Sequence, residues 1–270
     1  ASGLVSLILI CAIAMRLLAT IAGARPAPNA APDLPDHALP RYTILVPLYR
    51  EAAVLARLMD ALERIDYPRA RLDIKLLLEA DDDETRAALA RLAPGALYDV
   101  VVVPPGRPRT KPRALNVGLA FARGDLLTVY DAEDDPDPRQ LRRAAAAFAQ
   151  APPELACLQC PLTIDNARDS WLAGLFALDY AGLFDVLDPG LARLGLPIPL
   201  GGTSNHFRIE ALQRSQGWDA WNVTEDADMG ARLARAGYGV ATLDAPTWEE
   251  APARPRAWLS QRRRWMKGWA

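Results

Sequence analysis

The chain has 270 residues, a formal net charge of −2 and 51% hydrophobic residues. That length is enough for one large α/β domain, or two small ones, with a full hydrophobic core. The nearly balanced charge provides no basic field, so we expect no nucleic-acid partner. Three cysteines, Cys11, Cys157 and Cys160, cannot form a closed disulfide framework, which suits a reducing compartment.

The first 24 residues are apolar except at Arg16, which separates the apolar runs 3–15 and 17–24. The longer run is shorter than the ~20 residues of a spanning helix. A signal peptide would have positive charge before its apolar core, whereas Arg16 and Arg25 follow it here. Positive charge on the C-terminal side of a spanning helix keeps that side in the cytoplasm. We therefore expect residues 1–24 to be a truncated transmembrane helix with its C-terminal end in the cytoplasm. A buried helix is the alternative.

Beyond a proline-rich stretch at 25–40, which we expect to be an extended linker, strand and helix patterns alternate. Buried strands are predicted at 42–48, 72–78, 98–103, 125–130 and 154–160, and helices at 51–65, from about Asp83, at 112–122 and at 227–236. This alternation is typical of a parallel sheet covered on both faces. In such sheets ligands bind at the carboxyl ends of the strands.

Two later segments have more than one interpretation. Residues 170–187 form a long, aromatic-rich amphipathic stretch, which could be a core helix or could lie on a membrane surface. Cys157 and Cys160 have C-x-x-C spacing but lie inside the apolar run 155–162, with no second Cys or His pair nearby. That context favours a buried strand over a zinc or redox site.

An acidic loop, residues 131–137, directly follows the strand predicted at 125–130. Asp131 and Glu133 can bind one Mg²⁺ or Mn²⁺ and leave positions open for phosphate oxygens. Either Glu133 or Asp134 could be the second ligand. A calcium loop of the EF-hand type would need Gly where Pro136 stands, and a solvated acidic turn is the remaining alternative.

Charged residues also flank two other predicted elements. Glu79 and Asp81 follow the strand at 72–78. Lys111 comes just before the helix at 112–122, where its ammonium group and the helix N-terminus would both favour phosphate. An ordinary solvated lysine is the alternative for Lys111.

The segment Thr224 to Asp226 precedes the helix at 227–236. Thr is an ordinary N-cap residue, and acids in a first turn suit the helix dipole, so the segment can be explained without chemistry. Nearer the end of the chain, Gln261, Arg264 and Trp265 are spaced i, i+3 and i+4, so one helical face carries all three.

An indole can stack on a sugar, and a guanidinium group can bind a diphosphate. A basic juxtamembrane stretch is the alternative interpretation of this helix, and both can hold. On the predicted helix, Arg262, Arg263 and Lys267 point away from the face of Gln261, Arg264 and Trp265.

Four segments in this order, 131–133, 201–206, 224–226 and 261–265, resemble the motifs of the membrane-embedded, processive family 2 glycosyltransferases, the group that includes cellulose synthase. The resemblance covers residues 41–269. It implies a GT-A-like α/β fold with a mostly parallel twisted sheet over residues 41–254. Residues 255–270 would form a Q-x-x-R-W helix leading to further membrane segments.

The resemblance also implies an activity: inverting transfer from a UDP-sugar, UDP-glucose first, to the growing end of a β-glycan. The enzyme would lie in the inner membrane with its catalytic domain in the cytoplasm, and other subunits of a polysaccharide export complex could be partners. The implied roles are Asp226 as general base; Asp131 and Glu133 as metal ligands; Glu79, Asp81, Lys111, Asp131 and Arg264 at the donor; and Gln261, Trp265, Thr203 and His206 at the acceptor.

Two other classes remain open. A nucleotidyltransferase would share the sheet and the metal-binding acids but would not need residues 261–265. A catalytically silent subunit of a secretion complex would bind UDP without turnover.

Overall fold

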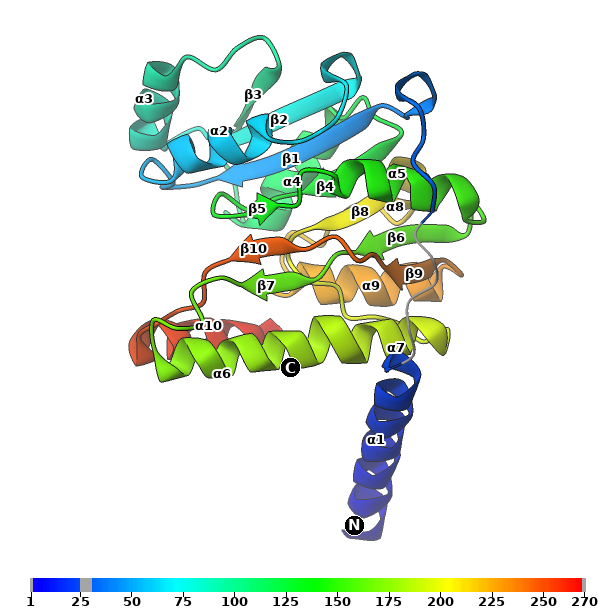
Figure 1. Ribbon diagram of the computed structural model, residues 1–270. Coiled ribbons are helices and arrows are strands. Elements are labelled where there is room, and N and C mark those ends of the chain that lie inside the picture. Colours follow the sequence, from blue (N-terminus) through cyan, green and yellow to red (C-terminus); the bar gives the residue numbers. More distant parts are fainter. Residues whose placement is uncertain (1, 25–30, 269–270) are drawn as a thin grey trace.

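The computed structural model describes residues 2–24 and 31–268 (Figure 1). Its larger sheet has the strand order β3-β2-β1-β4-β8-β6-β9. These strands are β1 (Tyr42–Leu48), β2 (Leu72–Glu79), β3 (Tyr98–Val103), β4 (Leu126–Val129), β6 (Leu155–Gln159), β8 (Asn205–Arg208) and β9 (Gly239–Thr242). All five predicted strands are therefore present.

Neighbouring strands of this sheet are parallel except at β8. β1 pairs in parallel with β2 and β4, β2 with β3, and β6 with β9. β8 is antiparallel to both of its neighbours, β4 and β6. The prediction of a mostly parallel sheet is confirmed, and β8 is an addition to it that begins within the motif segment 201–206.

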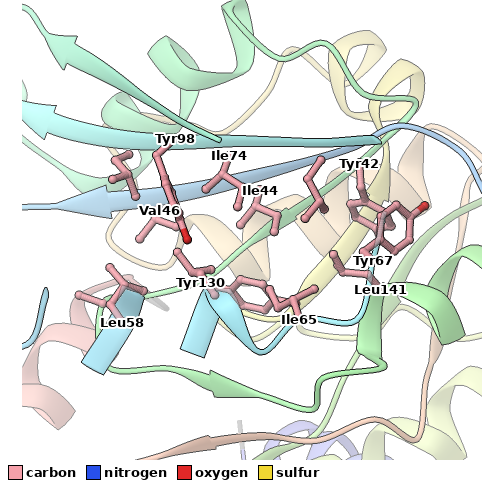
Figure 2. Packing of buried hydrophobic residues seen from close by; sticks show 14 of the residues in the cluster. Tyr42, Ile44, Val46, Leu58, Ile65, Tyr67, Ile74, Tyr98, Tyr130 and Leu141 are labelled. Atoms are coloured by element: carbon pink, nitrogen blue, oxygen red, sulfur yellow. The ribbon is translucent and has the colours of Figure 1, made fainter. Parts of the chain in front are cut away.

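Helices cover both faces of the sheet (Figure 1). α2 (Leu55–Glu63), α3 (Asp83–Leu92) and α5 (Gln140–Gln150) pack on one face, and α4 (Lys111–Ala120), α8 (Ile209–Arg214) and α9 (Glu225–Arg235) pack on the other. Strand β1 shows how covering both faces of the sheet affects the sequence of a strand. Tyr42, Ile44 and Val46 enter one core cluster and Leu45 enters the other, so the strand is apolar on both faces (Figure 2).

A smaller sheet consists of β5 (Asp135–Pro136), β10 (Thr247–Glu249) and β7 (Leu162–Ile164), in that order. β10 pairs antiparallel with β5 and parallel with β7. Strands of two or three residues carry no periodic signal, which is why the sequence did not predict them. Because β5 lies within the acidic segment 131–137, that segment is fixed between β4 of the larger sheet and this smaller one.

The segment 170–187 is helical and continues beyond its predicted end. α6 (Trp171–Tyr180) runs into a π-helical segment, η3 (Ala181–Leu187), and then into α7 (Asp188–Arg193). The buried side of α6 supports the core-helix interpretation, and the membrane-surface interpretation stays a prediction. Phe176 is buried, whereas Trp171, Leu175 and Leu178 are 74%, 54% and 71% exposed on the outer side of α6.

The N-terminal helix, α1 (Ser2–Gly23), projects from the base of the molecule next to α7 (Figure 1). Residues Gly3–Gly23 have a mean hydropathy of 2.5, and that length and composition suffice to cross a membrane. Its C-terminal end packs tightly on α7, because a side chain on Gly190 would collide with the Ala19 carbonyl. The helix is therefore attached to the domain at one end and exposed along most of its length.

Residues 31–40 lead from the N-terminal helix to β1, and residues 25–30 of the predicted linker lie outside the described part of the chain. Two short 3₁₀ helices occur near here, η1 (Asp36–Ala38) and η2 (Arg69–Arg71). Leu39 is fully buried in the same core cluster as Tyr42. The last residues of the predicted linker thus pack against the domain, and the proposed domain limits at residues 41 and 254 stay predictions.

Candidate active site

Lys111 and Asp131 meet at the carboxyl edge of the larger sheet. Lys111 is the first residue of α4, and Asp131 follows β4. The Lys111 ammonium group forms an ion pair with Asp131 Oδ1 and donates a hydrogen bond of 2.8 Å to the Gly202 carbonyl. Burial lowers the pKa of Lys111, but Asp131 and Glu225 outweigh that effect and raise it above its ordinary value. This lysine is therefore a fixed positive charge, not a free surface residue.

The acidic loop separates its carboxylates by role. Asp134 is 2% exposed, and its Oδ2 accepts hydrogen bonds from the Asp131 backbone N–H at 2.7 Å and from the Thr203 hydroxyl. Glu133 lies exposed on the same loop. Asp134 thus holds the loop in shape from inside, which leaves Asp131 and Glu133 as the pair available to a ligand.

Asp226 reaches the same place from α9. A Cβ atom built on Gly202 would lie 3.4 Å from Asp226 Oδ2 and 3.6 Å from Lys111 Nζ, so both side chains border this glycine. Asp226 Oδ1 accepts a 2.8 Å hydrogen bond from the Ala227 backbone N–H. Burial raises the pKa of Asp226, against the lowering effects of that hydrogen bond and of Lys111. A half-buried carboxylate therefore stands beside the Lys111–Asp131 pair.

The helix-cap explanation of residues 224–226 is incomplete. The Thr224 side chain makes no capping hydrogen bond to α9; its hydroxyl donates to Asn222 Oδ1 at 3.3 Å. Asp228, in the same first turn, forms an ion pair of 2.7 Å with Arg232. Asp226 forms no ion pair among the described residues. Its placement at Gly202 is thus not a by-product of capping.

Several acids around Asp131 have raised pKa values, as expected where carboxyl groups are withdrawn from water and lie close to one another. Burial raises the pKa of Glu133, with a further contribution from Asp131. Burial also raises the pKa of Glu225 and of Glu249 to about 7, and Asp131 adds to both effects. Nothing in the sequence singles out Glu249. It lies on β10, a strand that was not predicted, and the pair Glu249-Glu250 matches no motif.

The donor set fits a hard divalent cation. Asp131 and Glu133 provide carboxylate oxygens, and the Lys111 ammonium group already places positive charge against Asp131. No group of three or more His, Cys, Asp or Glu arranged for a metal occurs within residues 2–24 and 31–268. Magnesium is commonly bound by one or two carboxylates together with substrate phosphates. The residues present thus suit a metal that arrives with a diphosphate.

The acids after β2 have basic and aromatic neighbours. Asp81 forms an ion pair of 2.5 Å with Arg109, and Glu79, 6% exposed, lies 3.9 Å from Arg113. Arg109 also donates a 3.0 Å hydrogen bond to the Tyr49 hydroxyl and lies over the Tyr49 ring. Tyr49 and Arg109 are additions to the predicted set. The position of Tyr49, directly after the carboxyl end of β1, is the signal that could have identified it.

The turn that carries Tyr49 is held in an uncommon conformation. Arg50 has φ 63°, and its backbone N–H donates a 2.5 Å hydrogen bond to Asp82 Oδ2. Asp82 also caps α3 by accepting from the Thr85 backbone N–H at 3.1 Å. A positive φ at a residue other than glycine persists only where its surroundings determine it. The loops after β1 and β2 are thus joined into one rigid edge.

α10 (Pro255–Gly268) brings the last motif close to Asp226. A side chain on Gly268 would collide with Thr224, so the end of α10 rests on the segment that carries Asp226. Trp265 packs on Phe176 of α6, with ring centroids 6.1 Å apart. Gln261 Oε1 is buried with no hydrogen-bond partner among the described residues. Trp265 therefore faces the α6 side of the helix.

Three predicted residues lie elsewhere. Arg264 is exposed and lines an outer groove with Arg256 and Lys267, and no hydrogen bond or ion pair joins it to Asp131 or Lys111 in the described chain. Thr203 is 2% exposed, and its hydroxyl, which donates to Asp134, also lies 3.0 Å from the Val129 carbonyl oxygen. It braces the loop from inside, so an acceptor cannot reach its side chain.

His206 needs the clearest correction. It lies on β8, fully buried, with Nδ1 hydrogen-bonded to the Tyr42 hydroxyl at 2.6 Å and Nε2 to Gln140 Oε1 at 3.1 Å. Burial lowers the pKa of His206 to about 3, so the ring is neutral. This histidine belongs to the core and not to an acceptor entrance, because the segment 205–208 is a strand of the sheet and not a loop.

Comparison with known proteins adds a family. The family model described as "Glycosyltransferase like family 2" matches residues 40–268. Among curated proteins, a probable glycosyltransferase, YdaM, of Bacillus subtilis is 25% identical over 85% of this chain and 55% of its own length. The beta-monoglucosyldiacylglycerol synthase of Synechocystis is 29% identical over 85% of this chain and 48% of its own.

Plant enzymes and solved structures extend the likeness. Glucomannan 4-beta-mannosyltransferase 7 of Arabidopsis thaliana is 24% identical over 85% of this chain and 42% of its own length. The mannosyltransferase PcManGT from Pyrobaculum calidifontis, solved with GDP-Man and Mn²⁺, has a TM-score of 0.73 at 25% identity, over 93% of this chain and 69% of its own. S. aureus TarS with UDP-GlcNAc shares the fold alone, with a TM-score of 0.56 at 15% identity and coverage of 78% of this chain and 59% of its own.

The chain spans about half the length of the curated relatives that it matches. The matched part contains all the site residues described above, from Tyr49 to Gly268.

Proposed function

Because the chain belongs to glycosyltransferase-like family 2, we propose that it transfers a hexose from a nucleoside-diphosphate sugar to an acceptor hydroxyl, with inversion at the anomeric carbon. Membership of the family makes the chain a glycosyltransferase, and the GT-A-like α/β fold is confirmed by the sheet and by the likeness to PcManGT. The donor, the acceptor and the membrane context are parts of the proposal.

One observation carries the proposal: Lys111 and Asp226 both border Gly202, and Lys111 is ion-paired with Asp131. A positive group beside metal-binding acids suits a diphosphate, and a carboxylate within a few ångströms of them suits a general base. Glycine at the point of convergence leaves room for a ligand to approach the backbone. Three sequence segments separated by long stretches of chain thus form one small site.

The reaction that fits this site is a direct displacement. Asp226 accepts the proton of the acceptor hydroxyl while the hydroxyl oxygen attacks C1 of the donor sugar, and the bond from C1 to the diphosphate oxygen breaks. The nucleoside diphosphate leaves with the bonding electron pair, and Lys111 stabilises its charge. Because burial raises the pKa of Asp226, the carboxylate is a better base than an exposed aspartate. No covalent enzyme intermediate forms, so the anomeric centre inverts.

Asp131 and Glu133 would hold a divalent cation, Mg²⁺ or Mn²⁺, with the diphosphate. The cation, when bound, neutralises the charge that develops on the leaving diphosphate. The Mn²⁺ in the PcManGT complex supports divalent-metal dependence.

UDP-glucose is the first donor to test, and GDP-mannose is the second. UDP-glucose follows from the resemblance to cellulose synthase, with a β-glycan as the acceptor. GDP-mannose is supported by the ligand of PcManGT and by the mannosyltransferase names of the plant relatives. Glu79, Asp81 and the Tyr49–Arg109 pair would bind the nucleoside, because they lie at the next strand ends along the sheet.

We further propose that the protein works at the cytoplasmic face of the inner membrane. The exposed apolar length of α1 and the exposed apolar side of α6 support this placement. Subunits of an export complex stay possible partners in this proposal.

The test is release of nucleoside diphosphate from purified protein. UDP-glucose and GDP-mannose are offered separately with Mn²⁺, with and without cello- or manno-oligosaccharide, and the anomeric configuration of the product is read by NMR. Acceptor-dependent release with inversion supports the proposal. Tight donor binding without release would indicate a silent subunit, and pyrophosphate release from a nucleoside triphosphate would indicate a nucleotidyltransferase.

A further inference from the structure

Arg262 lies in an aromatic pocket between α6 and α10, although the helical pattern predicts that it points away from the site. Its Cζ atom is 5.2 Å from the ring centroid of Phe176, 5.7 Å from that of Trp258 and 4.9 Å from that of Trp265. Phe176 comes from α6 and the two tryptophans from α10. A guanidinium group over aromatic faces at these distances is attracted by the ring quadrupoles.

Asp179 of α6 holds this guanidinium group from the outer side. Arg262 Nη2 and Asp179 Oδ2 are 2.5 Å apart, with side chains 29% and 57% exposed. Arg262 Nε is buried and has no hydrogen-bond partner among the described residues. An ion pair exposed to this extent contributes little by itself. The aromatic rings therefore fix the plane of the Arg262 guanidinium group, and the ion pair with Asp179 fixes which way Nη2 points.

The same contacts fix the Trp265 indole. Its ring has Arg262 over one face and the Phe176 ring tilted by 41° beside it. Three residues beyond Trp265, Gly268 rests on Thr224, next to the proposed base Asp226. Any shift of α10 against α6 would thus change the orientation of the indole and the position of the segment carrying Asp226 together.

We propose that Arg262 is a positioning residue: braced by Asp179, it holds the Trp265 indole in the orientation that receives the acceptor sugar. The proposal rests on the proposed function, because it takes Trp265 as the residue on which the acceptor stacks. Lysine could keep the ion pair with Asp179 but lacks the planar guanidinium group that stacks on the rings. The role therefore requires arginine and not merely positive charge.

The first test observes the indole directly and needs no turnover. The full chain, in detergent and labelled with 5-fluorotryptophan, contains seven tryptophans, and Trp265→Phe identifies the Trp265 resonance by its loss. We expect that resonance to shift or broaden in Arg262→Met and Arg262→Lys, and less in Asp179→Asn. The matched control, Arg263→Met, removes the exposed arginine next along the same helix and should leave it unchanged.

The second test separates acceptor binding from the chemical step, with UDP-glucose, Mn²⁺ and cellohexaose as the probe acceptor. In Arg262→Met the KM for cellohexaose should rise about tenfold, the loss expected for a desolvated cation–π contact. The kcat at saturating acceptor and the affinity for UDP-glucose should stay unchanged, and Arg262→Lys should recover only part of the loss.

Two outcomes would overturn the proposal: an unmoved Trp265 resonance in Arg262→Met, or an unchanged KM accompanied by a lowered Tm, which is what a purely structural link would show. Absence of any turnover by the unmodified chain would contradict the proposed function instead. The fluorine resonances would in that case still decide whether Arg262 fixes the indole.

Discussion

The two halves of the site are built from different interactions. At the sheet edge, charged groups follow strand ends or begin helices, and several are paired with an opposite charge, as in Lys111–Asp131 and Asp81–Arg109. Between α6 and α10, aromatic faces dominate, and one exposed ion pair joins the helices.

The difference matches the chemistry of the two proposed substrates. A diphosphate is highly charged and needs fixed charges and a metal, whereas a neutral sugar binds through ring area and shape. The sheet-edge half should therefore respond to changes of charge, and the α6–α10 half to loss of aromatic surface. Each prediction below tests that division, beginning with the largest expected effect.

Asp226→Asn should lower kcat by about 10²–10⁴, because the amide cannot accept the proton of the acceptor hydroxyl. Donor affinity, measured by calorimetry, should barely change, because the carboxylate faces the acceptor. Asp228→Asn, in the same helical turn, is the control, since Asp228 is paired with Arg232. Near-normal turnover by Asp226→Asn would show that residues 224–226 have a purely structural role.

Asp131→Asn should weaken metal-dependent binding of the donor at least about 10–100-fold, the loss seen when even the outer partners of metal ligands are removed. The fold should survive, because Asp134 and not Asp131 holds the loop. Calorimetry with UDP-glucose in Mn²⁺ and in EDTA measures the effect. Glu133→Asp should be tolerated. Tight Mn²⁺-dependent binding by Asp131→Asn would remove Asp131 from the metal site.

Stability without metal should fall as the pH rises towards 8, because burial raises the pKa of Glu225 to about 7 from its ordinary 4.5. The folded state then keeps a proton that the unfolded chain releases, so this contribution is complete below pH 4.5 and lost as the pH rises through 7. Its size is about 3 kcal/mol. Urea unfolding in EDTA should show a flatter pH profile for Glu225→Gln than for the exposed control Glu84→Gln. Parallel profiles for the two variants would contradict the assignment.

His206→Ala should lower stability by about 1–3 kcal/mol, because the Tyr42 hydroxyl and Gln140 lose a buried partner. Its effect should be structural only, so the KM for the acceptor should not change in the protein that stays folded. Thermal unfolding and steady-state kinetics on the same preparation make this comparison. A raised acceptor KM at unchanged Tm would restore His206 to the acceptor site.

Trp265→Ala should raise the acceptor KM about tenfold through lost stacking, with the donor affinity unchanged. Trp171→Ala is the matched control, because that indole is 74% exposed on the outer side of α6. Equal effects of the two substitutions on cellohexaose kinetics would show that Trp265 has no special place at the acceptor.

The sequence by itself determined the parallel half of the sheet and the acids at its edge. Apolar runs such as residues 42–48 are readable because both faces of the strand are buried, and the rule for strand ends then identified Asp131. The pairing of Lys111 with Asp131 lay within reach for the same reason, since a helix that follows one strand begins at the edge where the next strand ends.

Only the tertiary structure decided which helical face or strand side each remaining residue occupies. Helical spacing grouped Arg264 with Gln261 and Trp265, but packing of α10 on α6 placed Arg262 against the aromatic rings and left Arg264 exposed. His206 entered the core because β8 pairs between β4 and β6, a long-range contact with no local signal. Periodicity states which residues share a face, whereas the partner of that face depends on contacts between distant parts of the chain.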